Sequence, residues 1–202
     1  AKPWFCVVIS MRFNVICSYG TAEQERTYNA VAERIARGEI KNLGSASAVM
    51  QGVYPNDATF RAAFAEKAIR TIQSRNNRVV RFILCALEKH LSDADYSFTS
   101  DSFNIEHVLP QNPQAGWETF SDEEADALTY RLGNMTLMQA GQNKNLGNAA
   151  YEEKRAVFQQ SGFAITRKLA TEHAEWTPER IAAHQNWMAA QATAIWRIAQ
   201  IG

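Results

Sequence analysis

The chain has 202 residues, of which 46% are hydrophobic, and its 21 basic residues balance 21 acidic ones. This composition describes an ordinary globular protein and excludes the disordered, collagen-like and coiled-coil classes. A chain of this length can bury a sufficient core without disulfides or a structural metal, so we interpret Cys6, Cys17 and Cys85 as reduced core residues of a cytoplasmic protein. The apolar stretch from Trp4 to Met11 is too short to cross a membrane and predicts a buried element.

Charge is unevenly placed along the chain although the net value is zero. Residues 66–90 contain six Lys or Arg and two Glu, residues 92–126 contain nine acidic residues and no Lys or Arg, and residues 131–168 contain six Lys or Arg and two Glu. Such segments form either solvated helix faces of opposite sign or a divided surface with one face for a polyanion. Three arginines, Arg75, Arg78 and Arg81, are spaced three residues apart. They could bind successive phosphates of a nucleic acid, or they could simply form a solvent-exposed helix face.

The first hundred residues are predicted to be mostly helical. Apolar spacing predicts helices over about 21–38, after Asn56-Asp57 and from about Arg75, whereas the Gly, Ser and Asn content of residues 44–55 predicts a loop. The polar connector 91–102 predicts a domain boundary. Residues 1–100 would then form a helical region packing on a core made of residues 101–202.

From residue 103 the pattern changes. Alternating apolar and polar residues up to Pro110 predict a short strand, and Ser121-Asp-Glu-Glu124 predicts a capped helix that runs to about Arg131. A second strand is predicted over 133–138, followed by helices from near Asn148, over 165–173 and from Pro178 to about Ile198. The predicted fold class is α+β and mostly helical, with a small ββα finger embedded among helices.

Several catalytic motifs are absent from the sequence. It has no phosphate-binding loop, dinucleotide fingerprint, zinc-protease motif or nucleophile elbow, so nucleotide hydrolysis, zinc proteolysis and esterase chemistry lack support. The helical histidines His90, His173 and His184 have no partners at metal-ligand spacing, and we interpret them as structural or surface residues. What remains is a cluster of polar residues in and after the two predicted strands: Glu106, His107, Asn134, Asn143, Asn148 and Lys154.

This cluster resembles the C-terminal nuclease domain of GmrSD-type restriction enzymes, a branch of the HNH or His-Me finger endonucleases. The resemblance is carried by Ile105-Glu-His-Val-Leu-Pro-Gln111, Leu132-Gly-Asn-Met-Thr-Leu137, Asn143 and Asn148 in Asn-x4-Asn, Tyr151-x2-Lys154, and Trp117, Trp187 and Trp196. It is concentrated in residues 103–158 and extends more loosely from about Val53 to the C-terminus, whereas residues 1–50 carry no motif.

The resemblance implies an HNH-like ββα-metal core that hydrolyses DNA with Mg²⁺ or Mn²⁺. It also implies a role in restriction of phage or other foreign DNA, which is often modified. The expected partner is an upstream nucleotide-using or sensing domain or subunit, and no membrane is expected to take part.

The chemistry of the cluster agrees with that implication. Phosphodiester hydrolysis needs an activated water, a cation near the phosphate and help for the departing 3′ oxygen. A histidine with an ordinary pKa near 6.5 can take the water's proton, so His107 is the candidate general base. A twisted strand end lets Glu106 and a helix-borne amide, Asn143, reach one hard cation. The resemblance implies these same roles and makes Asn134 a structural or orienting member of the catalytic set. The candidates for phosphate binding or support are Lys154, Asn148, Lys144 and Arg155.

Each candidate has a structural alternative. A histidine such as His107, taken alone, is more often a core or turn residue, and Glu106, which is longer than the aspartate common in related nucleases, could be a surface carboxylate of an edge strand. Asn134 could close a turn, Asn148 could be a plain helix N-cap and Lys154 could be a solvated lysine. The rival function is therefore a nucleic-acid-binding or interaction module that keeps the nuclease scaffold without cutting.

Overall fold

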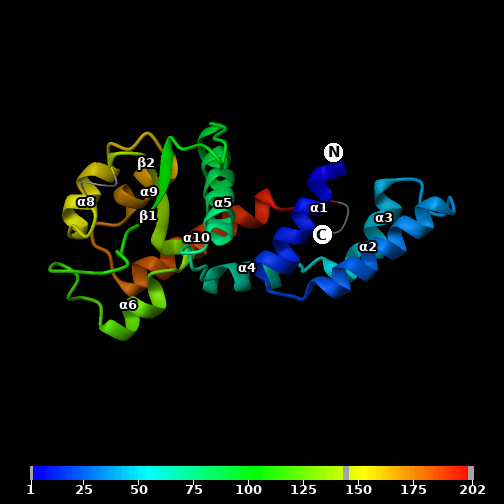
Figure 1. Cartoon of the computed structure of the whole chain (residues 1–202), viewed down its shortest axis with the longest axis horizontal. Helices are drawn as coiled ribbons and strands as arrows, with labels where there is room; N and C mark the ends of the chain where they lie inside the picture. Colours follow the sequence, from blue (N-terminus) through cyan, green and yellow to red (C-terminus); the bar gives the residue numbers. More distant parts are fainter. Residues whose placement is uncertain (1, 143–145, 200–202) are drawn as a thin grey trace. The chain divides into compact units, whose positions relative to one another are not determined.

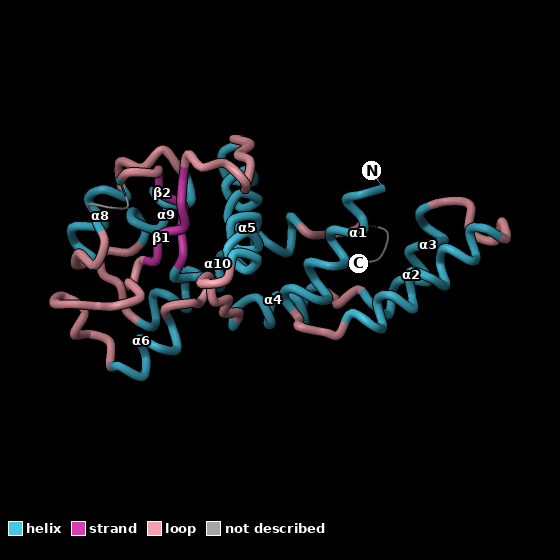
Figure 2. Tube along the Cα trace, viewed as in Figure 1, coloured by secondary structure: helices cyan, strands magenta, loops and turns pink. Residues whose placement is uncertain are grey.

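The structure, a computed structural model, describes residues 2–142 and 146–199 (Figure 1). It confirms the predicted class, because the described part of the chain is mostly helical and contains a small antiparallel sheet of two strands (Figure 2). Contacts group the chain into two compact units, Ala1–Phe64 with Ala192–Gly202, and Ala65–Gln191. The expected regions 1–100 and 101–202 stay a prediction. No described helix combines the length and apolar character that a membrane crossing requires.

The first unit is helical. Arg12, whose side chain is fully buried, donates to the carbonyl of Pro55 at 2.8 Å and pairs with Asp57 at 2.6 Å, so it ties the start of the chain to the helix that begins at Asp57. The elements of this part of the chain are α1 (Lys2–Ser10), η1 (Met11–Ile16), α2 (Thr21–Ala36), α3 (Leu43–Met50), η2 (Gln51–Val53) and α4 (Asp57–Glu66).

The loop predicted for residues 44–55 is wrong, because α3 and η2 occupy most of it. The side chain of Asn42 accepts a hydrogen bond from the Ser45 amide, and the Asn42 amide donates one to the Ser45 hydroxyl oxygen, which caps α3 at its first turn. Met50 and Val53 are buried and anchor the segment. Gly and Ser have low helix propensity, so tertiary burial overrode the local preference here.

The apolar stretch near the N-terminus forms α1 and is buried on one face only. Val8 and Ile9 are inaccessible, whereas Trp4 and Cys6 are exposed. The interpretation of the cysteines as core residues is therefore wrong for Cys6, and Cys17 is only half-buried; Cys85 alone of the three lies in the core. A helix places neighbouring residues on different faces, and an apolar run does not reveal which face is covered.

The second unit carries the sheet. The predicted capping box at Ser121 and Glu124 is confirmed by reciprocal side-chain bonds at the start of α6. The elements are α5 (Ser74–Ser92), β1 (Phe103–His107), α6 (Asp122–Leu128), η3 (Leu132–Asn134), β2 (Met135–Gln139), α8 (Tyr151–Phe158), α9 (Ala164–Glu172) and α10 (Pro178–Ile195), the last of which continues into the first unit.

β1 and β2 pair in antiparallel register, with Ile105 opposite Leu137 and His107 opposite Met135. Helix α5 packs against both strands and α9 packs against β2 (Figure 1). Because helices cover the sheet, Thr136 is buried along with its apolar neighbours, and its hydroxyl bonds to that of Thr166 at 2.8 Å.

The core of this unit lies between the end of β1, β2 and the later helices. The cluster of buried residues there comprises Val108, Leu109, Trp117, Phe120, Ala125, Met138, Leu146, Tyr151, Phe158, Leu169, Ala170, Trp176 and Ile181. The segment after His107 is thus fastened to the core immediately beyond the strand, which fixes where His107 itself stands.

Candidate active site

His107 ends β1, and its half-buried ring lies between two residues from other segments. Its Nε2 is 3.2 Å from the hydroxyl oxygen of Thr71, and the ring of Tyr130 meets it edge to face at a centroid distance of 5.6 Å. Burial, and after it the positive charge of Lys154, lowers the pKa of His107 to about 4. The imidazole is therefore neutral at cellular pH, which is the protonation state that a general base needs.

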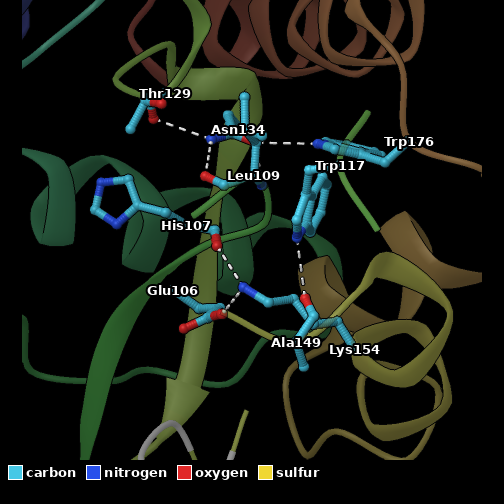
Figure 3. A network of polar contacts seen from close by, with 9 residues as sticks. All are labelled: Glu106, His107, Leu109, Trp117, Thr129, Asn134, Ala149, Lys154 and Trp176. Carbon is cyan, nitrogen blue, oxygen red and sulfur yellow. Dashed lines mark hydrogen bonds and ion pairs between the residues drawn. The ribbon is translucent and has the colours of Figure 1, made fainter. Parts of the chain in front are cut away.

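Glu106 and Lys154 form a buried ion pair between β1 and α8. The Lys154 Nζ lies 2.6 Å from Glu106 Oε1 and also donates to the His107 carbonyl at 2.9 Å, as Figure 3 shows. The Lys154 side chain is inaccessible and only 3% of Glu106 is exposed. Burial raises the pKa of Glu106 and lowers that of Lys154, while the charge of each partner opposes the shift of the other.

Asn134 fastens the chain that follows His107. Its Oδ1 accepts from the Leu109 amide at 2.8 Å and from Trp176 Nε1 at 3.0 Å, and its Nδ2 donates to the carbonyls of Leu109 at 2.9 Å and Thr129 at 3.0 Å (Figure 3). The residue is inaccessible. An amide has four hydrogen-bonding positions and all four are used here, so Asn134 fits the orienting role rather than substrate contact.

Trp117, part of the motif set, supports the same region. Its Nε1 donates to the Ala149 carbonyl at 3.2 Å, and its ring lies 5.9 Å from the Lys154 ammonium (Figure 3). The loop before α6 is thereby held against the loop before α8. This packing role explains why an aromatic residue stands in a loop otherwise rich in polar residues.

A pocket of about 350 Å³ opens over the end of β1. Its lining is dominated by polar groups, several of them amide side chains: Thr71, Asn77, Ile105, Glu106, His107, Pro110, Gln111, Asn112, Gly147 and Asn148. The structure thus brings His107, Glu106 and Asn148, three residues predicted from the sequence, to the wall of one cavity.

The pocket wall contains oxygen donors of the type that hard divalent cations prefer. Glu106 Oε2 makes no hydrogen bond among the described residues, and the amide side chains around it supply oxygen donors, which Mg²⁺ and Mn²⁺ prefer. Within residues 2–142 and 146–199 no group of three or more His, Cys, Asp or Glu side chains could hold a metal ion. The second predicted ligand, Asn143, lies outside the described residues. Since Lys154 offsets the charge of Glu106, a cation here would depend on negative charge brought by a phosphate.

The residues predicted to bind phosphate or to support the site have different surroundings. Lys154 is buried in its ion pair, so a role in supporting the site fits it better than direct contact with a phosphate of the substrate. Arg155 Nε donates to the Ala170 carbonyl at 2.9 Å and so braces α8 on α9. Asn148 is not the N-cap of α8, because Ala150 holds that position, and it lines the pocket instead. Lys144 lies outside the described residues.

Sequence reasoning missed Thr71, Tyr130 and Asn77. Thr71 is 36 positions before His107 and belongs to no motif, and Tyr130 follows α6 as one aromatic among many. The only signal was indirect: the segment around Thr71 and Asn77 is basic and polar where it approaches the start of a helix.

The family of GmrSD restriction endonucleases, C-terminal domain, matches residues 54–191, which is more than half of the chain. That range includes the Glu106–Lys154 ion pair, Asn134 with its hydrogen-bond partners, and every described residue of the pocket. No curated protein matches the chain. A nuclease role in restriction follows from the family, and its DNA substrate with it. The chain thus belongs to the GmrSD restriction endonucleases and carries their C-terminal domain.

Proposed function

We propose that this domain is a divalent-metal-dependent DNA endonuclease that cuts one strand per engagement, with His107 as the general base. The observation that carries the proposal is a histidine in the wall of a polar pocket, with its Nε2 held by the hydroxyl of Thr71. Burial keeps this imidazole unprotonated before the reaction, so a ring nitrogen has a lone pair that can accept a proton from water.

In the proposed reaction, His107 removes a proton from a water molecule as its oxygen attacks the phosphorus. The bond from phosphorus to the 3′ oxygen breaks, the 3′ oxygen takes a proton from solvent, and the products carry a 5′-phosphate and a 3′-hydroxyl. Asn134 holds the backbone at Leu109 so that the ring of His107 stays in place. Cutting both strands of a duplex requires two such events.

Glu106 and Asn143 would hold Mg²⁺ or Mn²⁺, which supplies positive charge where negative charge grows on the phosphate. The charge of Lys154 favours the ionised form of Glu106 against the effect of burial, and the ion pair holds the carboxylate in position. The proposed biological setting is restriction of phage or other foreign DNA, with a nucleotide-using or sensing domain or subunit as partner.

One observation favours a second candidate. The only carboxylate in the pocket wall as described is already paired with Lys154, an arrangement that a non-cutting nucleic-acid-binding module could also keep. The two candidates differ in whether the chain hydrolyses DNA with a divalent metal.

The test is conversion of supercoiled plasmid to nicked circle by the purified chain in Mg²⁺ or Mn²⁺. We expect nicking that EDTA abolishes and that His107→Ala reduces to background. His90→Ala, which changes an exposed histidine on α5, should nick at the rate of the unmodified chain. Nicking that survives in His107→Ala would overturn the role of His107. Absence of nicking on unmodified and modified DNA, also in a longer chain with its partner, would favour the non-cutting module.

A further inference from the structure

Three exposed arginines lie in a segment without acidic residues. Residues 67–87 contain five Lys or Arg and no Asp or Glu. Arg70, Arg75 and Arg78 are exposed, whereas Arg81 turns inward and donates to the carbonyls of Phe98, Ser100 and Phe103. The interpretation of Arg81 as a surface residue is thus wrong. The three exposed arginines of this segment are Arg70, Arg75 and Arg78.

These three arginines have no ion pair among the described residues. Other arginines of the same unit do: Arg131 pairs with Glu66 at 2.7 Å and Arg180 pairs with Glu175 at 3.6 Å. A guanidinium that has no carboxylate partner keeps its full charge available to an external anion.

Arg70 and Arg78 stand beside the pocket, and Arg75 lies about one helical turn before Arg78 in α5. Thr71 and Asn77, which line it, are chain neighbours of Arg70 and Arg78. The guanidinium carbon of Arg70 lies 5.4 Å from the centroid of the Tyr130 ring, and that ring in turn meets His107 at 5.6 Å. One aromatic ring therefore separates Arg70 from the proposed general base.

We propose that Arg70, Arg75 and Arg78 form a DNA-docking edge that binds phosphates flanking the one to be cut. Charge complementarity carries the choice of a nucleic-acid backbone as partner, since guanidinium groups bind phosphate oxygens in two-pronged hydrogen bonds. The edge rests on the proposed function, which places the scissile phosphate over His107. It deepens that function by naming the surface that positions the strand.

The experiment measures binding without cleavage. A fluorescent duplex is titrated with full-length His107→Ala chain over a range of salt concentrations, and anisotropy gives Kd. Single Arg→Ala changes at the three positions and the triple change are compared in this background, with folding checked by circular dichroism. Each lost phosphate contact should lower the slope of log Kd against log salt by about 0.9, and the triple change should add these losses.

Arg180→Ala is the matched control, because it removes one exposed positive charge from the same unit at a residue with its own carboxylate partner. It should leave the slope unchanged. A triple variant with the slope of this control would overturn the edge, and so would a His107→Ala chain that fails to bind DNA at low salt. If the slope falls as expected but the unmodified chain never nicks DNA, the edge stands and the catalytic proposal alone fails.

Discussion

The imidazole of His107 is held by partners that belong to neither its own strand nor its own motif. Thr71 contacts one ring nitrogen and Tyr130 packs against the ring edge, so the ring has one preferred orientation in the pocket. A base that must act on a bound water depends on such orientation, because small displacements of the reacting atoms reduce the rate steeply. We infer that Thr71 is a positioning residue for His107.

Thr71→Val should lower the rate of nicking by up to about 100-fold, because it keeps the shape of the side chain but removes the hydroxyl that holds Nε2. Thr71→Ser, which keeps the hydroxyl, should retain most of the rate. Single-turnover nicking, with DNA affinity measured in parallel, separates this effect from lost binding. Equal rates for the two variants would contradict the positioning role.

At the scale of secondary-structure elements, a buried ion pair connects β1 to α8. Lys154 reaches from the helix to Glu106 and to the His107 carbonyl, so the strand end and the helix are fixed together.

A close backbone contact fixes η3 against α10. A Cβ on Gly133 would lie 2.5 Å from the Ile181 carbonyl oxygen and 2.6 Å from Gln185 Cβ. The Leu132-Gly-Asn134 sequence thus requires its glycine for packing against α10.

Lys154→Met should lower the free energy of unfolding by about 3–5 kcal/mol, because it leaves Glu106 buried without its partner. Lys89→Met is the control: its partner Asp95 and Lys89 itself are exposed, and such pairs contribute about 0–1 kcal/mol. Denaturant unfolding of both variants measures the difference. The double variant Glu106→Gln with Lys154→Met should recover part of the loss. If Lys154→Met costs no more than Lys89→Met, the ion pair does not stabilise the junction.

At the scale of the whole molecule, buried histidines link stability to pH. His173 and His184 are 8% and 1% exposed, and their ring nitrogens have no hydrogen-bond partner among the described residues. Burial, then the charges of His173 and Lys168, lowers the pKa of His184 to about 3; burial also lowers the pKa of His173. This burial is consistent with the interpretation of His173 and His184 as structural residues. The third helical histidine, His90, lies on the surface.

A histidine with a lowered pKa in the folded state binds its proton more readily in the unfolded chain. Its contribution to stability is therefore complete above pH 6.5 and falls as the pH drops below that value towards the pKa of the folded state. Between neutral pH and pH 5, His184 should therefore lower the free energy of unfolding by about 2 kcal/mol. The variant His184→Leu should lose that part of the pH dependence of stability. Denaturant unfolding at pH 7 and pH 5 measures it, with the exposed His90→Ala as control. An undiminished pH dependence in His184→Leu would refute the assignment.

Several features of the second unit could be predicted from the sequence. These are the positions of its helices, its two strands, and the presence of His107 and Glu106 in the wall of one pocket. Local patterns determine these features: apolar spacing for α5, α9 and α10, alternation for β1 and the Ser121 capping box for α6. The same local signals failed for α3, where buried Met50 and Val53 outweigh a composition typical of loops. They also placed Arg81 on the surface, although it satisfies three buried or half-buried carbonyls.

By itself, the sequence determined the fold class, the order of the main elements in the second unit and the residue types available for hydrolysis, because these depend on local periodicity and on motifs that lie close together in the chain. Only the tertiary structure decided which partners those residues have. Thr71 reaches His107 across 36 positions, Lys154 reaches Glu106 across 48 and Trp176 reaches Asn134 across 42. The pKa of His107 and the burial of Lys154 follow from these long-range contacts, since desolvation and pairing depend on what packs around a group and not on its neighbours in sequence.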